Sequence, residues 1–141
     1  MANDSSGARE FIVGLLGRPP LHQWLHLELT AIDFDAGTIT ITLPYRDELS
    51  RSLDQRDYHG GVIATLIDVA GHSCLAAKLG RRLPTIDMRV DYLRSAVDTN
   101  LVAHARIVRS GQTVGVCEVE IVDDTQRKVA IGRCVFSTVQ R

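Results

Sequence analysis

The chain has 141 residues, 45% of them hydrophobic, and a formal net charge of -1 at pH 7. This length suits one compact domain with a sizeable core. The small net charge and the scattered basic residues exclude the electrostatic footprint of a protein that binds nucleic acid or an anionic membrane surface. Cys74, Cys117 and Cys134 lie far apart and form no CxxC pair, which predicts neither a disulfide framework nor a zinc site but a reducing compartment.

The first 20 residues predict a short helical extension at the start of a single domain spanning residues 1–141. Ser5 or Ser6 can cap a helix that ends near Gly17, before two consecutive prolines. Its apolar residues are Phe11, Ile12, Leu15 and Leu16. The acidic residues Asp4 and Glu10, and an apolar run broken by glycine, predict neither a signal peptide nor a membrane span, so we expect a cytoplasmic protein.

Residues 25–43 predict a hairpin of two strands that each bury one face. Apolar and polar residues alternate on both sides of the turn Asp35-Ala36-Gly37. The apolar set is Leu25, Leu27, Leu29 and Ala31 before the turn, and Ile39, Ile41 and Leu43 after it. Residues 44–58 are polar and predict an irregular segment.

Residues 60–79 are apolar almost all round, which predicts a long buried helix closed by Gly80. Alternating segments follow at 85–93 and 101–109, then at 113–122 and 128–139, with short turns after the second and third. In the first of these segments the apolar set is Ile86, Met88, Val90 and Tyr92. A hairpin, a helix and an antiparallel meander predict an α+β domain in which one central helix is wrapped by a curved sheet of five to six strands.

One polar stripe interrupts the apolar surface of this helix. Gly61, Thr65, Asp68 and His72 are three or four residues apart and therefore share a face. An ionised carboxylate among apolar side chains is costly unless it is paired or hydrogen-bonded, so Asp68 serves either structure or chemistry. Gly60 and Gly61 leave the backbone N–H groups of the first turn open to a carbonyl oxygen or an oxyanion.

One copy of the helix cannot bring both features to the same carbonyl group. Gly60 and Asp68 are eight residues apart, which is roughly 12 Å along a helix, whereas a reacting carbon lies within roughly 3.5 Å of its nucleophile. If the two cooperate, Asp68 must come from a second, antiparallel copy. The spacing therefore predicts a homodimer with its site between the chains.

The segment "YHGGVIATLIDVAGHSCLAAKLG" followed by "LPTIDMRVDYLRSA" resembles the hotdog-fold acyl-CoA thioesterases of the PaaI-like (phenylacetyl-CoA thioesterase) type. The shared pattern is His-Gly-Gly, an acidic residue two helical turns later, and a Ser or Thr that opens a strand ending in Tyr-Leu and a basic residue. The resemblance covers about residues 25–139. It implies a hotdog fold, hydrolysis of an acyl-CoA, a homodimer that assembles into a tetramer, and no metal or redox cofactor.

The resemblance also implies roles for single residues. Asp68 would be the catalytic carboxylate, either as general base or as nucleophile, and Gly60 would polarise the thioester carbonyl. His59 would shape the helix end, and Thr85 would lie near the carboxylate and orient water.

Substrate contacts are expected from Gly61 and Thr65, and from Arg94, which takes the basic position after Tyr-Leu and could bind a phosphate of coenzyme A. The chain departs from the family pattern at Leu53, where an Asn or Gln is common. Gln55 could replace that amide if the loop is shifted.

Two other function classes stay open at this stage. Hotdog domains also serve as acyl-CoA sensors without catalysis. A hotdog hydratase would need a histidine and an acid at the substrate, and His59 and Asp68 are available. We expect His72 to be structural and the pair His22 and His26 to bind no metal.

Overall fold

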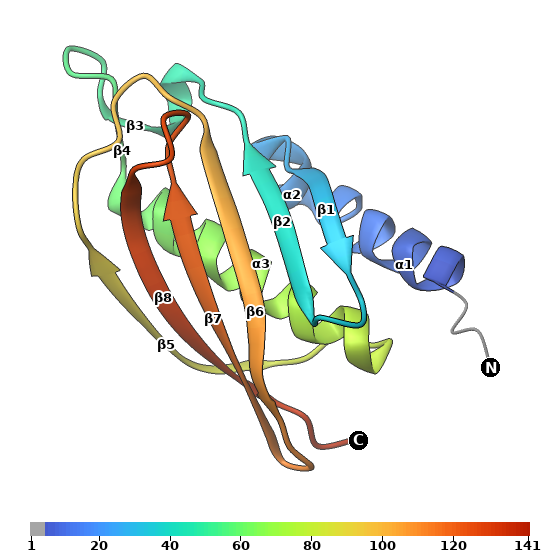
Figure 1. The fold of residues 1–141 in the computed structure, drawn as a ribbon. Helices are drawn as coiled ribbons and strands as arrows, with labels where there is room; N and C mark the ends of the chain where they lie inside the picture. The colour runs from blue at the N-terminus through green and yellow to red at the C-terminus, as the bar shows by residue number, and fades with distance from the viewer. Residues whose placement is uncertain (1–4) are drawn as a thin grey trace.

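The long helix α3 (Gly60–Leu79) lies across one face of a six-stranded antiparallel sheet in the computed structural model, which describes residues 5–141 (Figure 1). Asp4, considered above, lies outside the described residues. Two helices precede the sheet, α1 (Ser5–Gly17) and α2 (Pro20–Leu25). The sheet strands are β1 (Glu28–Asp33), β2 (Thr38–Leu43), β5 (Thr85–Tyr92), β6 (Leu101–Ser110), β7 (Val114–Val122) and β8 (Lys128–Ser137).

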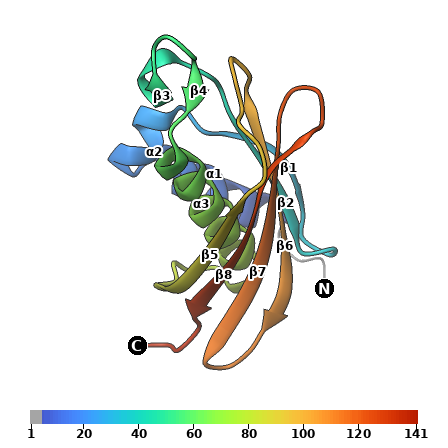
Figure 2. The same ribbon diagram turned by 90° about the vertical axis from the view of Figure 1, so that its left-hand side faces the viewer.

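The strand order β1-β2-β6-β7-β8-β5 makes α3 a crossover between the first hairpin and the far edge of the sheet. In profile the sheet curves, and all three helices lie on the same side of it (Figure 2). Beyond one end of the sheet, the 3₁₀ turn η1 (Asp47–Leu49) and the small hairpin β3 (Ser50–Ser52) and β4 (Asp57–Tyr58) lead into α3. The predicted α+β class with one central helix is confirmed.

Helix α3 begins and ends where the sequence predicts. His59 is its N-cap, and Gly80 closes it with a positive φ of 68°, a conformation that glycine adopts without strain. Leu66, Ile67 and Leu75 are fully buried against the sheet. Length and mean hydropathy alone would suit a membrane span, but α3 is the core helix of this domain.

The first hairpin is confirmed, but Leu25 lies in the core outside the hairpin, and Ala31 was wrongly predicted to be buried. Leu25 belongs to α2, because Pro20 at the first helical position favours a new helical turn after Pro19. A bulge between Leu29 and Ala31 reverses the alternation, so that Ala31 is exposed and Ile32 faces the core instead.

Strand β5 lies at an edge of the sheet and pairs with β8. In the predicted meander, it would have paired with β6, the next strand in the chain. Met88 and Val90 pack on the core, as predicted, whereas Ile86 and Tyr92 are more than half exposed. A bulge between Thr85 and Asp87 displaces Ile86. Along its other side, β5 pairs with no strand among the described residues.

Candidate active site

The start of α3 presents one backbone donor, not the two that the sequence suggested. The Nδ1 atom of His59 accepts the N–H of Gly61 at 2.9 Å, so this donor is used in the helix cap. Val62 donates its N–H to the carbonyl of His59. Within residues 5–141, the Gly60 N–H has no acceptor. Because Nδ1 accepts, the neutral imidazole of His59 carries its proton on Nε2.

Two turns later, Thr85 holds the half-buried Asp68. The Thr85 hydroxyl, at the first residue of β5, donates to Oδ1 of Asp68 at 2.9 Å. The other carboxylate oxygen, Oδ2, accepts no hydrogen bond from any described residue. Asp68 therefore keeps one oxygen fixed and the other available to a water molecule or a substrate.

The open N–H and the open carboxylate oxygen lie on the same helix, but two turns apart. With the helix unbroken from Gly60 to Leu79, the rise of 1.5 Å per residue separates Gly60 from Asp68 by about 12 Å. A single chain thus holds an open backbone donor and a carboxylate with one open oxygen, without bringing them together.

Other predicted site residues lie around the start of α3. The Thr65 hydroxyl donates back to the Gly61 carbonyl at 2.8 Å, which uses its proton within the helix. Leu53 and Gln55 lie in the exposed loop between β3 and β4, and the Gln55 side chain accepts a hydrogen bond from Arg51.

His72 has a structural contact. Its Nε2 accepts the backbone N–H of Leu83 at 3.0 Å, and burial lowers the pKa of the imidazole, which favours its neutral form. This bond ties α3 to the chain two residues before Thr85.

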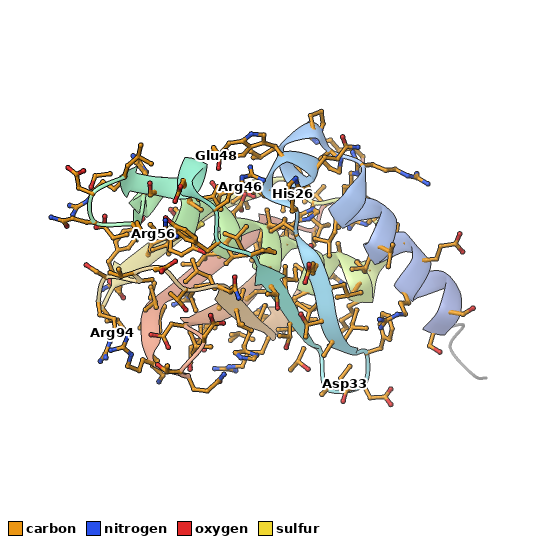
Figure 3. The ribbon with its side chains drawn as sticks, turned by 90° about the horizontal axis from the view of Figure 1, so that it is seen from above. His26, Asp33, Arg46, Glu48, Arg56 and Arg94 are labelled. Carbon is orange, nitrogen blue, oxygen red and sulfur yellow. The ribbon has the colours of Figure 1, made fainter. Side chains whose placement is uncertain are left out.

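The two other histidines considered above do not converge. His22 bonds the Leu15 carbonyl, and His26 is the left-handed cap of α2 beside Arg46 rather than a strand residue as predicted (Figure 3). Groups of three or more His, Cys, Asp or Glu side chains suited to a metal ion are absent from residues 5–141.

The arginines near the exit of α3 make separate contacts. Arg81 donates to the Thr138 carbonyl, and Arg89 pairs with Asp91 on the sheet. Arg94, just beyond β5, is exposed and points away from the body of the domain (Figure 3). Arg94 is two residues from Tyr92, which reaches the start of α3.

Tyr92 is a contact of the site to which the sequence analysis gave no role. Its hydroxyl donates to the Gly60 carbonyl at 2.7 Å. The only sequence signal was its place in the Tyr-Leu-basic motif, and that motif does not reveal which atom the side chain meets.

A hollow of about 660 Å³ lies elsewhere, on the face of the sheet away from α3. Arginine and acidic side chains line it and pair with one another, as Arg106 does with Glu118. None of the predicted site residues borders it. A paired, charged surface of this kind is a weaker candidate for acyl chemistry than the start of α3.

Comparison with known proteins points to the same segment. The family model described as "Thioesterase superfamily" matches residues 57–130, which include Gly60, Asp68 and Thr85. A protein of Halobacterium salinarum, named for a proposed esterase activity, is 37% identical over 121 residues, covering 78% of this chain and 80% of that protein.

Two further likenesses agree with this family. The medium/long-chain acyl-CoA thioesterase YigI of Escherichia coli is 37% identical over 93 residues, which cover 55% of this chain and 60% of YigI. The structure of E. coli PaaI, from the phenylacetic acid degradation operon, superposes with a TM-score of 0.86 at 21% identity, covering 98% of this chain and 97% of PaaI, and so supports the fold. By its matching segment and its fold, the chain belongs to the thioesterase superfamily.

Proposed function

We propose that the protein hydrolyses the thioester bond of an acyl-CoA to a free acid and coenzyme A. The observation that carries this proposal is the pair of open groups on α3, the Gly60 N–H and the Oδ2 oxygen of an Asp68 that Thr85 holds in place. Membership of the thioesterase superfamily supports the reaction class.

The reaction needs one donor and one base. The Gly60 N–H, at the positive end of the helix dipole, hydrogen-bonds the thioester carbonyl oxygen and stabilises the negative charge that develops on it. The Oδ2 atom of Asp68 takes a proton from water as the water oxygen bonds to the carbonyl carbon. Collapse of the tetrahedral intermediate then breaks the C–S bond, and Asp68 returns the proton to the departing thiolate. Direct attack by Asp68 on the same carbon is the alternative.

We further propose that each site combines Gly60 of one chain with Asp68 of a second copy. The free side of β5 supports this assembly, because an unpaired eight-residue edge strand with exposed Ile86 and Tyr92 is a ready surface for strand pairing. Two-fold pairing of β5 with its own copy is antiparallel, and it sets the two α3 helices antiparallel as well. Assembly of two such dimers into a tetramer remains an expectation.

The coenzyme would be bound as part of the substrate. Arg94 and Gln55 are exposed polar residues, one just beyond β5 and the other in the loop before α3, and they are our candidates for its phosphates and amides. The proposed chemistry uses water and the residues named, without a metal or redox cofactor. A cytoplasmic location is part of the proposal, and three buried free cysteines suit a reducing compartment.

The geometry favours hydrolysis over hydration of an enoyl thioester. A hydratase needs an imidazole nitrogen free to take a proton. In His59, Nδ1 is occupied by the Gly61 N–H, and Nε2 carries the proton.

The test is thiol release from aryl, short-chain, medium-chain and long-chain acyl-CoAs by the native protein and by Asp68→Asn. Asparagine keeps the size of the side chain and an oxygen for the Thr85 hydroxyl, but it replaces Oδ2 by an amide donor. We expect the variant to lose roughly a hundredfold or more in kcat. Asp33→Asn is the matched control, since Asp33 Oδ1 also accepts one hydrogen bond at 2.9 Å, from Ala36. Equal rates for native protein and Asp68→Asn would refute the role of Asp68, and no release from any substrate would favour a sensor.

A further inference from the structure

The tandem glycines at the start of α3 pose a mechanical problem for a catalytic donor. Glycine has more backbone freedom than any other residue, and a helix end is where backbone order is weakest. An oxyanion donor stabilises a transition state only if it is held in place before the reaction. Something other than local propensity must therefore hold Gly60 and Gly61.

The peptide group between these glycines is held from both sides. Its carbonyl oxygen, on Gly60, accepts the Tyr92 hydroxyl at 2.7 Å, and its N–H, on Gly61, donates to His59 Nδ1 at 2.9 Å. Two hydrogen bonds on opposite edges of one planar group fix its rotation. The Gly60 N–H, which has no acceptor of its own among residues 5–141, belongs to the preceding peptide, whose carbonyl, on His59, accepts the Val62 N–H at 3.0 Å, so the peptide groups on both sides of Gly60 are held.

The Tyr92 ring also covers Gly60. A Cβ atom added at Gly60 would lie 3.4 Å from the Tyr92 hydroxyl oxygen and 3.5 Å from its ring carbons, so the aromatic ring occupies the side of this residue that a side chain would fill. Tyr92 therefore restrains the first residue of α3 by packing as well as by hydrogen bonding.

Strand β5 thus holds both parts of the site. At its first residue, Thr85 bonds Asp68, and just before it the His72–Leu83 bond ties the same end to α3. At its last residue, Tyr92 bonds Gly60. A movement of this edge strand would displace the donor and the carboxylate together.

We propose that Tyr92 is a positioning residue for the reaction, which locks the Gly60–Gly61 peptide so that the Gly60 N–H meets the thioester oxygen. The role in catalysis rests on the proposed function, whereas the lock itself is a property of the fold. The Tyr92 hydroxyl contacts the Gly60 carbonyl, so its proposed role is to position the donor rather than to bind the substrate.

The test compares the native protein with Tyr92→Phe, which keeps the ring and removes the hydroxyl. Tyr92 is about half exposed, so removal of its hydroxyl should not unfold the domain. Because the Gly61 N–H is hydrogen-bonded to His59, its amide hydrogen exchange, read in glycine-labelled protein, should become at least about threefold faster. We expect kcat to fall about tenfold to a hundredfold, with KM within about twofold, because the donor acts on the transition state.

Tyr58→Phe is the matched control, since the Tyr58 hydroxyl also donates to a backbone carbonyl, that of Thr99, at 2.8 Å. It should lower thermal stability and leave kcat within about twofold. Unchanged exchange at Gly61 in Tyr92→Phe would overturn the lock, whatever the activity. Faster exchange with an unchanged kcat would overturn the positioning role. A native protein that releases no thiol would refute the proposed function and the catalytic role with it, and exchange would still decide the lock.

Discussion

A mixture of two inactive variants tests whether the site is shared between chains. Gly60→Pro removes the proposed donor outright, because proline has no N–H. The backbone accepts it: Gly60 is the first residue of α3, where proline is favoured, and His59 has the extended conformation, φ -64° and ψ 133°, that suits a residue before proline. Asp68→Asn removes the base. Each variant alone should keep below about 1% of the native kcat.

Co-expression of the two variants at equal levels should restore activity. About half of the pairs are then mixed, and each mixed pair holds one site with an intact Gly60 and an intact Asp68. Since a native pair has two sites, the mixture should reach about a quarter of the native rate per mass of protein. Thiol release at saturating substrate measures it, and assembly of pairs into tetramers leaves the fraction unchanged.

The reciprocal experiment is the control. A chain that carries both substitutions, co-expressed with the native chain, should also give about a quarter of the native rate if the site is shared, but about half if each chain holds a whole site. A mixture of the single variants that is no more active than either parent would refute the 12 Å argument and the shared site.

Two further predictions concern stability. Gly132→Ala should lower the free energy of unfolding, followed by thermal melting, by about 1–3 kcal/mol. The new methyl group would lie 2.4 Å from Cγ2 of Ile67 on α3. The control Gly17→Ala, whose methyl group would have nothing within 4 Å, should be near neutral in the same measurement. The buried Asp123 has its pKa lowered to about 2, since hydrogen bonds from Thr125 and Arg127 outweigh the opposing effect of burial. A carboxylate whose pKa is lower in the folded state stabilises the protein at pH values above its unfolded pKa. The loss in free energy of unfolding caused by Asp123→Asn, measured with denaturant, should therefore be constant above about pH 4 and shrink between about pH 4 and 2. A loss that stays constant down to about pH 2 would contradict this.

Local patterns predicted most of the secondary structure, and they failed where a backbone irregularity intervened. The limits of α3 were predictable because Gly80 and the apolar run are local signals. Ala31 and Ile86 were misplaced because a bulge of one residue reverses or displaces every later side chain, and periodicity does not report bulges. The position of β5 beside β8 is a long-range pairing, which no local pattern encodes.

The sequence already contained the residue types of the proposed site and the spacing from which we propose a second chain. His-Gly-Gly at a helix start and an acid eight residues later are a local arrangement, and the rise of a helix sets their separation. The tertiary structure decided which donor is open and what holds it. Among the described residues, the Gly60 N–H has no acceptor, whereas His59 caps Gly61, Thr85 fixes one oxygen of Asp68, and Tyr92 reaches Gly60 from across the fold. Hydrogen bonds between residues 17 to 32 positions apart depend on how strand and helix cross, and sequence spacing does not contain that geometry.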